Sequence, residues 1–176
     1  MRAELIRHPD TPSGSVKRIR VGFAPSGYGP TKLEYRVFAS GGLSLPPPEG
    51  AKRRDRLWET TCFELFVRPE PDDTYSEFNF SPSRAWAAYQ FQSYRKGRRD
   101  LPLAAPKIDF WNDVSGCSLR AELGLIMPWA WQCRVGLSAV IEEADGTKSY
   151  WALAHPPGEP DFHHPDCFAL ELPPLV

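Results

Sequence analysis

The clearest hairpin signal in the chain is CRVGLSAVIEEADGTKSYWALA, residues 133–154. Two runs rich in apolar and β-branched residues, CRVGLSAVI and SYWALA, flank the dipeptide Asp145-Gly146. Asp-Gly between two such runs is a strong signal for a tight turn between paired strands, because both residues tolerate a positive φ. The sequence therefore predicts two antiparallel strands at this point.

The same strand periodicity extends through most of the chain. Apolar residues alternate as Ile19, Val21 and Phe23 in RIRVGF, as Leu33, Tyr35 and Val37 in KLEYRVFA, and as Leu119, Ala121, Leu123, Leu125 and Met127 in LRAELGLIM. A last strand is predicted over CFALEL, and one helical turn over MPWAW. Many short strands without an intervening helix pattern predict an all-β fold, an antiparallel, jelly-roll-like β-sandwich.

Size and charge narrow the class of protein further. A chain of 176 residues predicts one domain, 1–176, and the net charge of -1 gives no reason to expect a nucleic-acid partner. The basic runs 52–56 and 95–99 are interpreted as solvated loops. No segment is apolar for long enough to span a membrane, and the N-terminus lacks a secretory pattern. We therefore expect a cytoplasmic protein, with its oligomeric state left open.

Four cysteines, at positions 62, 117, 133 and 167, lack the CxxC spacing of zinc or redox motifs. They are predicted to be reduced residues, most of them in the core.

A buried carboxylate is predicted in the segment LWETTCFELFV, residues 57–67. If the strand begins at Trp58, alternation places Trp58 and Glu64 on one face and Phe63, Leu65 and Val67 on the other. Glu64 then lies mid-strand among apolar residues, where an unpaired carboxylate is costly. Either a basic neighbour such as Arg36 or Arg134 satisfies it, or a ligand does.

YSEFNF, residues 75–80, repeats this arrangement, with Tyr75, Glu77 and Asn79 on one face. Carboxylate, amide and aromatic groups on one sheet face suit a polyhydroxylated ligand, because hydroxyls need donors and acceptors while sugar C–H groups stack on aromatic rings. A solvated outer sheet face would show a similar alternation.

Three blocks, RLWETTCFELFV, YSEFNFSPSRAWAAYQFQSYRKG and YWALAHPPGEPDFHHPDCFALEL, resemble the bacterial DOMON-like proteins, relatives of family 9 carbohydrate-binding modules. The resemblance implies a β-sandwich whose concave side binds a sugar or, in some DOMON domains, haem. It also implies that Trp58 is one wall of a sugar clamp, aided by Glu64, and that Phe162 stands where the family has the second tryptophan. Asn79 matches a family asparagine, whereas Glu77 stands where the family has an arginine.

The sequence is also compatible with other functions. The segment DFHHPD, with His155 upstream, contains enough ligand types for a metal, but neighbouring histidines on an extended chain point in opposite directions, so no metal site is predicted. A haem would need an axial ligand, for which the candidates are His155, His163, His164 and Met127. A hydrolase or lyase could use Glu64 and Glu77 as its carboxylate pair.

The leading hypothesis is a non-catalytic module, without a cofactor, that binds a saccharide or a sugar-containing metabolite between Trp58 and Phe162. Glu64, Glu77 and Asn79 are expected to pair with hydroxyl groups. The list of predicted ligand-binding residues is completed by Arg84 and Arg95, for an acidic substituent, and by His163 at the mouth of the sandwich.

Overall fold

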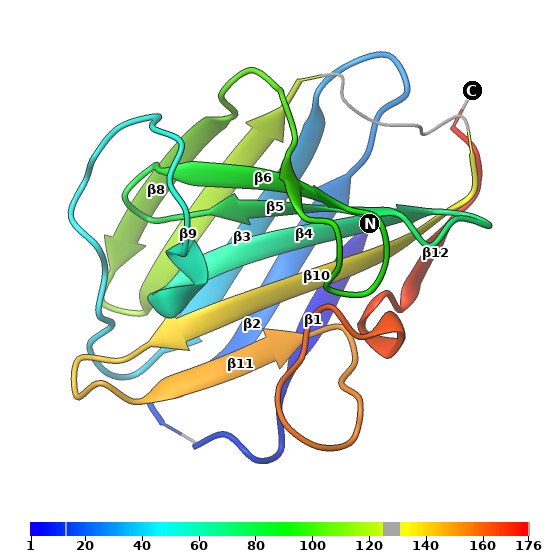
Figure 1. Ribbon diagram of the computed structural model, residues 1–176. Helices are drawn as coiled ribbons and strands as arrows, with labels where there is room; N and C mark the ends of the chain where they lie inside the picture. Colours follow the sequence, from blue (N-terminus) through cyan, green and yellow to red (C-terminus); the bar gives the residue numbers. More distant parts are fainter. Residues whose placement is uncertain (13, 125–130, 176) are drawn as a thin grey trace.

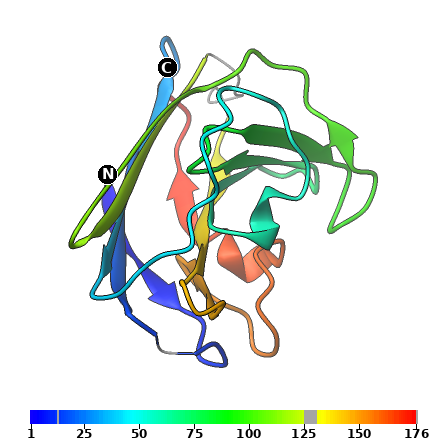
Figure 2. The ribbon, with the colours of Figure 1, turned by 90° about the vertical axis from the view of Figure 1, so that its left-hand side faces the viewer.

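The chain forms two stacked β-layers. The structure, a computed structural model, describes residues 1–12, 14–124 and 131–175. Within these residues eleven strands pair antiparallel along one continuous path, with a twelfth, β12, paired to β10 beside it. The sheet curls over so that two layers face each other (Figures 1 and 2). The all-β antiparallel sandwich predicted from the sequence is confirmed.

The front layer, nearest the viewer in Figure 1, carries the features of interest for function. Its strands, in spatial order, are β7 (Arg99–Asp100), β6 (Trp86–Phe91), β5 (Tyr75–Phe80), β4 (Cys62–Pro69), β10 (Cys133–Glu142) and β11 (Lys148–Ala152), and β12 (Leu170–Leu172) pairs with one end of β10. The back layer consists of β2 (Val16–Ala24), β3 (Thr31–Ala39), β9 (Gly116–Leu123) and β8 (Lys107–Asp113).

Strand β1 (Arg2–Arg7) connects the two layers. Its first part pairs with β2, where Leu5 lies opposite Ile19, and its last part pairs with β11, where Ile6 lies opposite Ala152. The N-terminal strand therefore belongs to both layers.

The main hydrophobic core lies between the layers, and the predicted alternation supplies it. Ile19, Val21 and Phe23 of β2 are buried against Phe63 and Leu65 of β4. Leu119, Ala121 and Leu123 are buried as predicted, while positions 125 and 127 of the same pattern, and most of the predicted turn at MPWAW, lie outside the described residues.

The hairpin at Asp145-Gly146 is confirmed. Strands β10 and β11 pair from Ser138 opposite Ala152 to Glu142 opposite Lys148, and Gly146 adopts a φ of 85° in the turn. The predicted strand CFALEL is shorter than expected, because a 3-10 turn, η2 (Pro165–Cys167), occupies its start. Proline favours the first position of such a turn.

A second 3-10 turn, η1 (Leu57–Glu59), corrects the predicted start of strand β4. The backbone N–H of Thr60 donates to the carbonyl of Leu57 at 3.3 Å, so the chain turns before it becomes extended at Cys62. Trp58 therefore does not lie on the same strand as Glu64.

All four cysteines are buried thiols. Among the residues that the structure describes, no helix has the length and apolar character needed to cross a bilayer.

Candidate ligand-binding site

The outer face of the front layer carries a row of polar side chains across three strands. On β4, Phe63, Leu65 and Val67 point into the core between the layers, so Glu64 points the opposite way. Strand pairing places Ser138 of β10 and Asn79 of β5 on either side of it. The faces predicted for the strand residues of β4 and β5 are therefore those observed.

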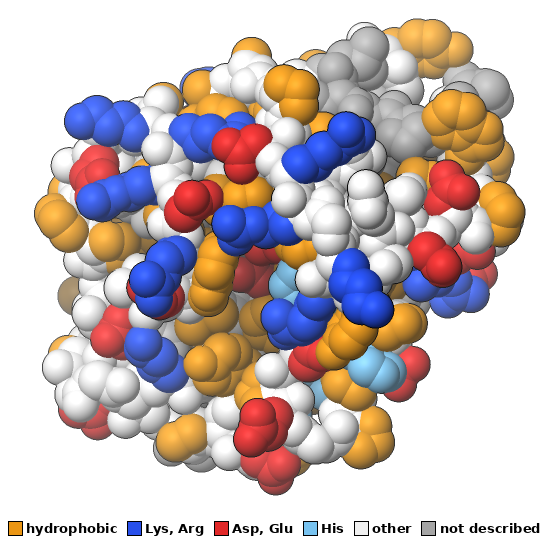
Figure 3. Space-filling model, viewed as in Figure 1, with side chains coloured by type: hydrophobic (Ala, Val, Ile, Leu, Met, Phe, Trp, Pro, Cys, Tyr) orange, Lys and Arg blue, Asp and Glu red, His pale blue; other side chains and the backbone are white. Residues whose placement is uncertain are grey.

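A cavity of about 460 Å³ lies over this face, which is within the usual range for small-ligand sites. Turn η1 and the chain around η2 lie beside it, on the side of the front layer away from the back layer (Figure 2). Figure 3 shows the hollow, with acidic and histidine side chains visible inside it and Lys and Arg side chains around it. The lining residues are Trp58, Glu64, Phe66, Glu77, Phe91, Arg95, Arg98, Val140, Tyr150, Pro160, Phe162 and His163.

Glu64 is held in place without an ion pair to any basic side chain that the structure describes. Its side chain is only 3% exposed, and the Ser138 hydroxyl donates a hydrogen bond to its Oε2 at 3.0 Å. Arg36 pairs with Asp113 instead, and Arg134 pairs with the carboxylates of positions 70 and 171. Arg36 and Arg134, the two basic partners that the sequence suggests for Glu64, thus pair with other carboxylates.

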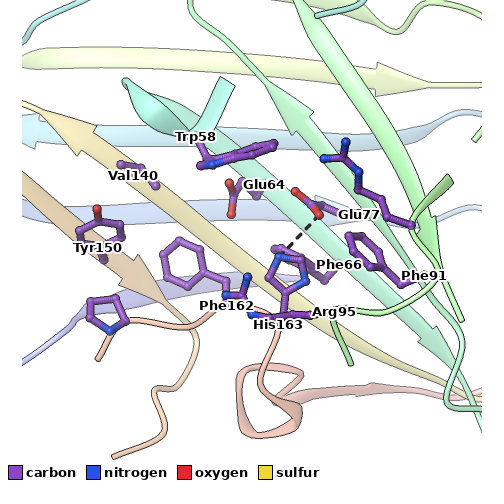
Figure 4. Close-up of a pocket in the computed structure, with 12 residues that line it drawn as sticks. Trp58, Glu64, Phe66, Glu77, Phe91, Arg95, Val140, Tyr150, Phe162 and His163 are labelled. Carbon is purple, nitrogen blue, oxygen red and sulfur yellow. Dashed lines mark ion pairs between the residues drawn. The ribbon is translucent and has the colours of Figure 1, made fainter. Parts of the chain in front are cut away.

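Glu77 is the second buried carboxyl group of the cavity, at 4% exposure. Its Oε1 accepts a hydrogen bond from Nδ2 of Asn79 at 2.7 Å, and its Oε2 lies 3.7 Å from Nε2 of His163 (Figure 4). Asn79 is fully buried and does not line the cavity, so it orients Glu77.

Burial raises the pKa of both carboxyl groups above their ordinary range, because the charged form loses its hydration. The negative charge of Glu77 raises the pKa of Glu64 further. The hydrogen bond from Asn79 and the positive charges of Arg98 and Arg95 act against this effect at Glu77. The pair therefore retains a proton at a higher pH than isolated carboxyl groups would.

His163 is neutral and fixed by Tyr75. The Tyr75 hydroxyl lies 2.7 Å from Nδ1 and accepts a hydrogen bond from the backbone N–H of Arg95 at 3.2 Å, which leaves its own proton to be donated to the ring. Burial, and then the charge of Arg95, lowers the pKa of His163 to about 4. The remaining ring proton is on Nε2 and faces Glu77.

Aromatic rings form the walls of the cavity. In the view of Figure 4, the Glu64 side chain lies between Trp58 and Phe162. Trp58 packs edge-on against Tyr89, with 6.3 Å between the ring centroids, and Phe162 packs against Tyr150 at 6.1 Å. These rings offer apolar surface next to the two carboxyl groups.

Two arginines lie at the cavity and come from the loop after β6. The Arg95 guanidinium forms an ion pair with Asp161 at 2.6 Å, which fastens this loop to the segment that carries Phe162 and His163. The guanidinium of Arg98 stacks over the ring of Tyr89 at 4.8 Å.

The structure brings together six of the predicted binding residues: Trp58, Glu64, Glu77, Arg95, Phe162 and His163. Arg84 is exposed in the turn between β5 and β6, with a φ of 70°, and does not line the cavity. Arg98, which the sequence predicts to lie in a solvated run, also lines the cavity, and the sequence does not predict the contact of Ser138 with Glu64. A serine inside the apolar run CRVGLSAVI was the available signal for Ser138.

Within the described residues, no cluster of three or more His, Cys, Asp or Glu side chains could hold a metal ion. Of the histidines named as possible haem ligands, His163 lines the cavity, His155 contacts the carbonyl of Ile6 at 2.8 Å, and His164 accepts from the backbone of Asp166 at 3.3 Å. Met127 lies outside the described residues.

The fold and the cavity together define a β-sandwich with a carboxyl-containing, aromatic-walled site on the outer face of one layer. Solved structures with this architecture include a "putative carbohydrate-binding protein" from Bacteroides uniformis ATCC 8492, with a TM-score of 0.67, 15% identity and coverage of 95% of this chain and 83% of that one. No protein-family model and no curated protein sequence matches the chain.

Two further similar structures are family 9 carbohydrate-binding modules from Caldicellulosiruptor kristjanssonii. The module in complex with glucose has a TM-score of 0.52 at 7% identity and covers 88% of this chain and 76% of that one. The module in complex with cellotriose has a TM-score of 0.50 at 8% identity, with 80% and 67% covered. At such identities the likeness shows the fold.

Proposed function

We propose that this protein is a DOMON-like, non-catalytic module that binds a saccharide or a sugar-containing metabolite in the cavity of the front layer. The observation that carries the proposal is the pair of buried carboxyl groups, Glu64 and Glu77, that face an aromatic-walled cavity on this fold. The fold is shared with modules found in complex with glucose and with cellotriose, which supports a saccharide as the ligand.

The side chains of the cavity match the chemistry of a sugar. Trp58 offers an indole on which the C–H face of a pyranose can stack, and Phe162 provides apolar surface near it. Glu64 and Glu77 accept hydrogen bonds from hydroxyl groups and, when protonated, donate one as well. Ser138 and Asn79 hold these carboxyl groups in place before the ligand arrives, which reduces the entropy lost on binding.

Calorimetric titration against a saccharide panel tests the proposal. Sites of this kind bind in the micromolar to millimolar range, about -4 to -8 kcal/mol, so high protein concentrations are needed. Trp58→Ala should weaken binding by about tenfold or more, because the stacking platform is lost. Trp111→Ala is the matched control. This partly exposed indole lies in the back layer, away from the cavity, with the Arg120 guanidinium stacked over it. Unchanged binding by Trp58→Ala, or no saccharide bound by the native protein, would contradict the proposal.

A carbohydrate-active enzyme is the second candidate, favoured by one observation. Two carboxyl groups with raised pKa values face one cavity, and glycoside hydrolysis needs such a pair, with one group kept protonated. Turnover of chromogenic glycosides that disappears in Glu64→Gln, with the fold retained, would establish catalysis in place of simple binding.

A further inference from the structure

The floor of the cavity contains two acidic groups that form no direct ion pair with a basic side chain in the described part of the chain. Glu64 and Glu77 are held by the neutral donors Ser138 and Asn79. His163, which faces Glu77 at 3.7 Å, is neutral. Among the described residues, no Lys or Arg forms an ion pair with either carboxyl group.

The basic side chains of the cavity are engaged elsewhere. Arg95 is bound to Asp161, and Arg98 stacks on Tyr89. The positive charges of both arginines act on Glu77 only from a distance, without an ion pair. The groups beneath the carboxyls are also unable to supply positive charge, because Tyr35 donates to the backbone carbonyl of Glu64 and Cys62 is a buried thiol. The positive charge that would complete this floor is therefore expected from the ligand.

The aromatic walls suit the same kind of ligand. Phe66 and Phe91 line the cavity beside Glu77, and Trp58 lies beside Glu64 (Figure 4). The face of an aromatic ring attracts a cation, most strongly for indole, and the attraction grows when water is excluded. Carboxylates surrounded by aromatic rings thus favour an ammonium group over a neutral hydroxyl.

We propose that the saccharide bound here is an amino sugar, whose ammonium group lies between Glu64 and Glu77 while its ring stacks on Trp58. This inference rests on the proposed function and narrows its ligand class. An acidic sugar would place a further negative charge against two buried carboxyl groups, which is unfavourable.

Binding of an amino sugar should release protons. Because burial raises the pKa of both carboxyl groups, the empty site retains a proton that an isolated carboxyl pair would have lost. A bound ammonium favours the ionised forms, so the proton leaves when the ligand enters. A neutral sugar offers no such driving force.

Calorimetry with wild-type protein tests the inference directly. D-glucosamine and D-galactosamine are compared with D-glucose, D-galactose and N-acetyl-D-glucosamine, at neutral pH, in two buffers of different ionisation enthalpy. We expect at least one amino sugar to bind about 10- to 100-fold tighter than its neutral counterparts, which is the usual advantage of a charged hydrogen bond. Its apparent enthalpy should also depend on the buffer, as proton release requires.

Variants test whether the preference for amino sugars depends on the two carboxyl groups. Glu64→Gln and Glu77→Gln should bring the affinity ratio of amino to neutral sugar close to one, whereas the surface variant Glu122→Gln should leave it unchanged. If either Gln variant fails to fold, the affinity ratio and the buffer dependence of the binding enthalpy of the wild type still test the inference.

The possible failures are distinguishable. Neutral sugars that bind as tightly as both amino sugars would overturn this inference and leave the proposed function intact. Ethanolamine, an amine without a sugar ring, should bind far more weakly, and equal binding by it would overturn the saccharide proposal itself. Absence of binding by every sugar in the panel would overturn both.

Discussion

At the scale of single residues, the cost of burying two acids defines the site. Glu64 and Glu77 are nearly inaccessible to water, and each receives one neutral hydrogen bond. An interior of this kind disfavours two adjacent negative charges, so the protein tolerates the pair by keeping it partly protonated. Such a pair destabilises the ligand-free protein as pH rises. When a ligand is bound, the same two groups are available to form hydrogen bonds with it.

The contribution of Glu64 and Glu77 to the free energy of unfolding should therefore fall with rising pH. A carboxyl group with a higher pKa in the folded protein than in the unfolded chain binds a proton on folding, so its contribution is complete below the ordinary value of 4.5 and is lost as pH rises through the raised value. Glu64→Gln cannot ionise, and its free energy of unfolding should exceed that of the wild type at alkaline pH by on the order of 1 kcal/mol. Denaturant titrations across pH measure this difference.

The titration of His163 also changes the free energy of unfolding with pH, but in a different pH range. Its pKa is lowered to about 4 by burial, so its own contribution grows from that pH up to its ordinary value of 6.5 and is constant above. Measurements above pH 6.5 thus report the carboxyl groups. Parallel pH profiles for wild type and Glu64→Gln in that range would contradict the assignment.

At the scale of elements, the segment between β11 and β12 lies beside the cavity and is held by contacts of Asp161 and His163. The Asp161 carboxylate accepts hydrogen bonds from the Arg95 guanidinium, the Tyr94 hydroxyl and the backbone N–H of His163. This cluster joins the loop after β6 to the segment that carries Phe162. The position of one cavity wall therefore depends on Asp161.

Asp161→Ala should loosen this wall without unfolding the protein. We expect faster amide hydrogen exchange over residues 160–164 and about tenfold weaker ligand binding, with a loss of stability on the order of 1 kcal/mol, because the ion pair is partly exposed. Asp166→Ala is the matched control, since Asp166 lies in the same segment, exposed and away from the cavity. Equal exchange and affinity in the two variants would show that Asp161 does not position the wall.

Elements also show what the sequence could and could not predict. Period-two alternation was sufficient for the strands, and it placed Glu64, Glu77 and Asn79 on the correct face. It failed at Trp58, because local hydrogen bonds of η1 interrupt the extended chain before Cys62. Arg98 reaches the cavity through a loop whose course depends on tertiary contacts, and no local pattern encodes them.

At the scale of the whole molecule, both layers share one core. Side chains of the front layer, such as Phe63 and Leu65, belong to the same buried cluster as Ile19 and Tyr35 of the back layer. The β1 strand adds backbone pairing between the layers. The front layer also carries a second, smaller buried cluster on its outer face, around Phe66 and Phe168. Its inner face, however, is buried in the core that it shares with the back layer.

Unfolding should accordingly occur in one cooperative transition, which tests the prediction of a single domain over residues 1–176. Far-ultraviolet circular dichroism and tryptophan fluorescence should give the same midpoint. Leu5→Ala, which removes a buried side chain where β1 joins the layers, should shift both midpoints together and cost about 2 to 5 kcal/mol. Two separate transitions in either protein would contradict the shared core.

The position of β1 also dictates when the protein can be completed during synthesis. Its pairing with β2 can form early, but its pairing with β11 requires Trp151 and Ala152, which leave the ribosome long after β1 and β2. Contacts this distant along a chain form slowly. Nascent chains that lack residues 148–152 would leave the end of β1 and an edge of β10 open, so chaperone protection is most needed until β11 has left the ribosome.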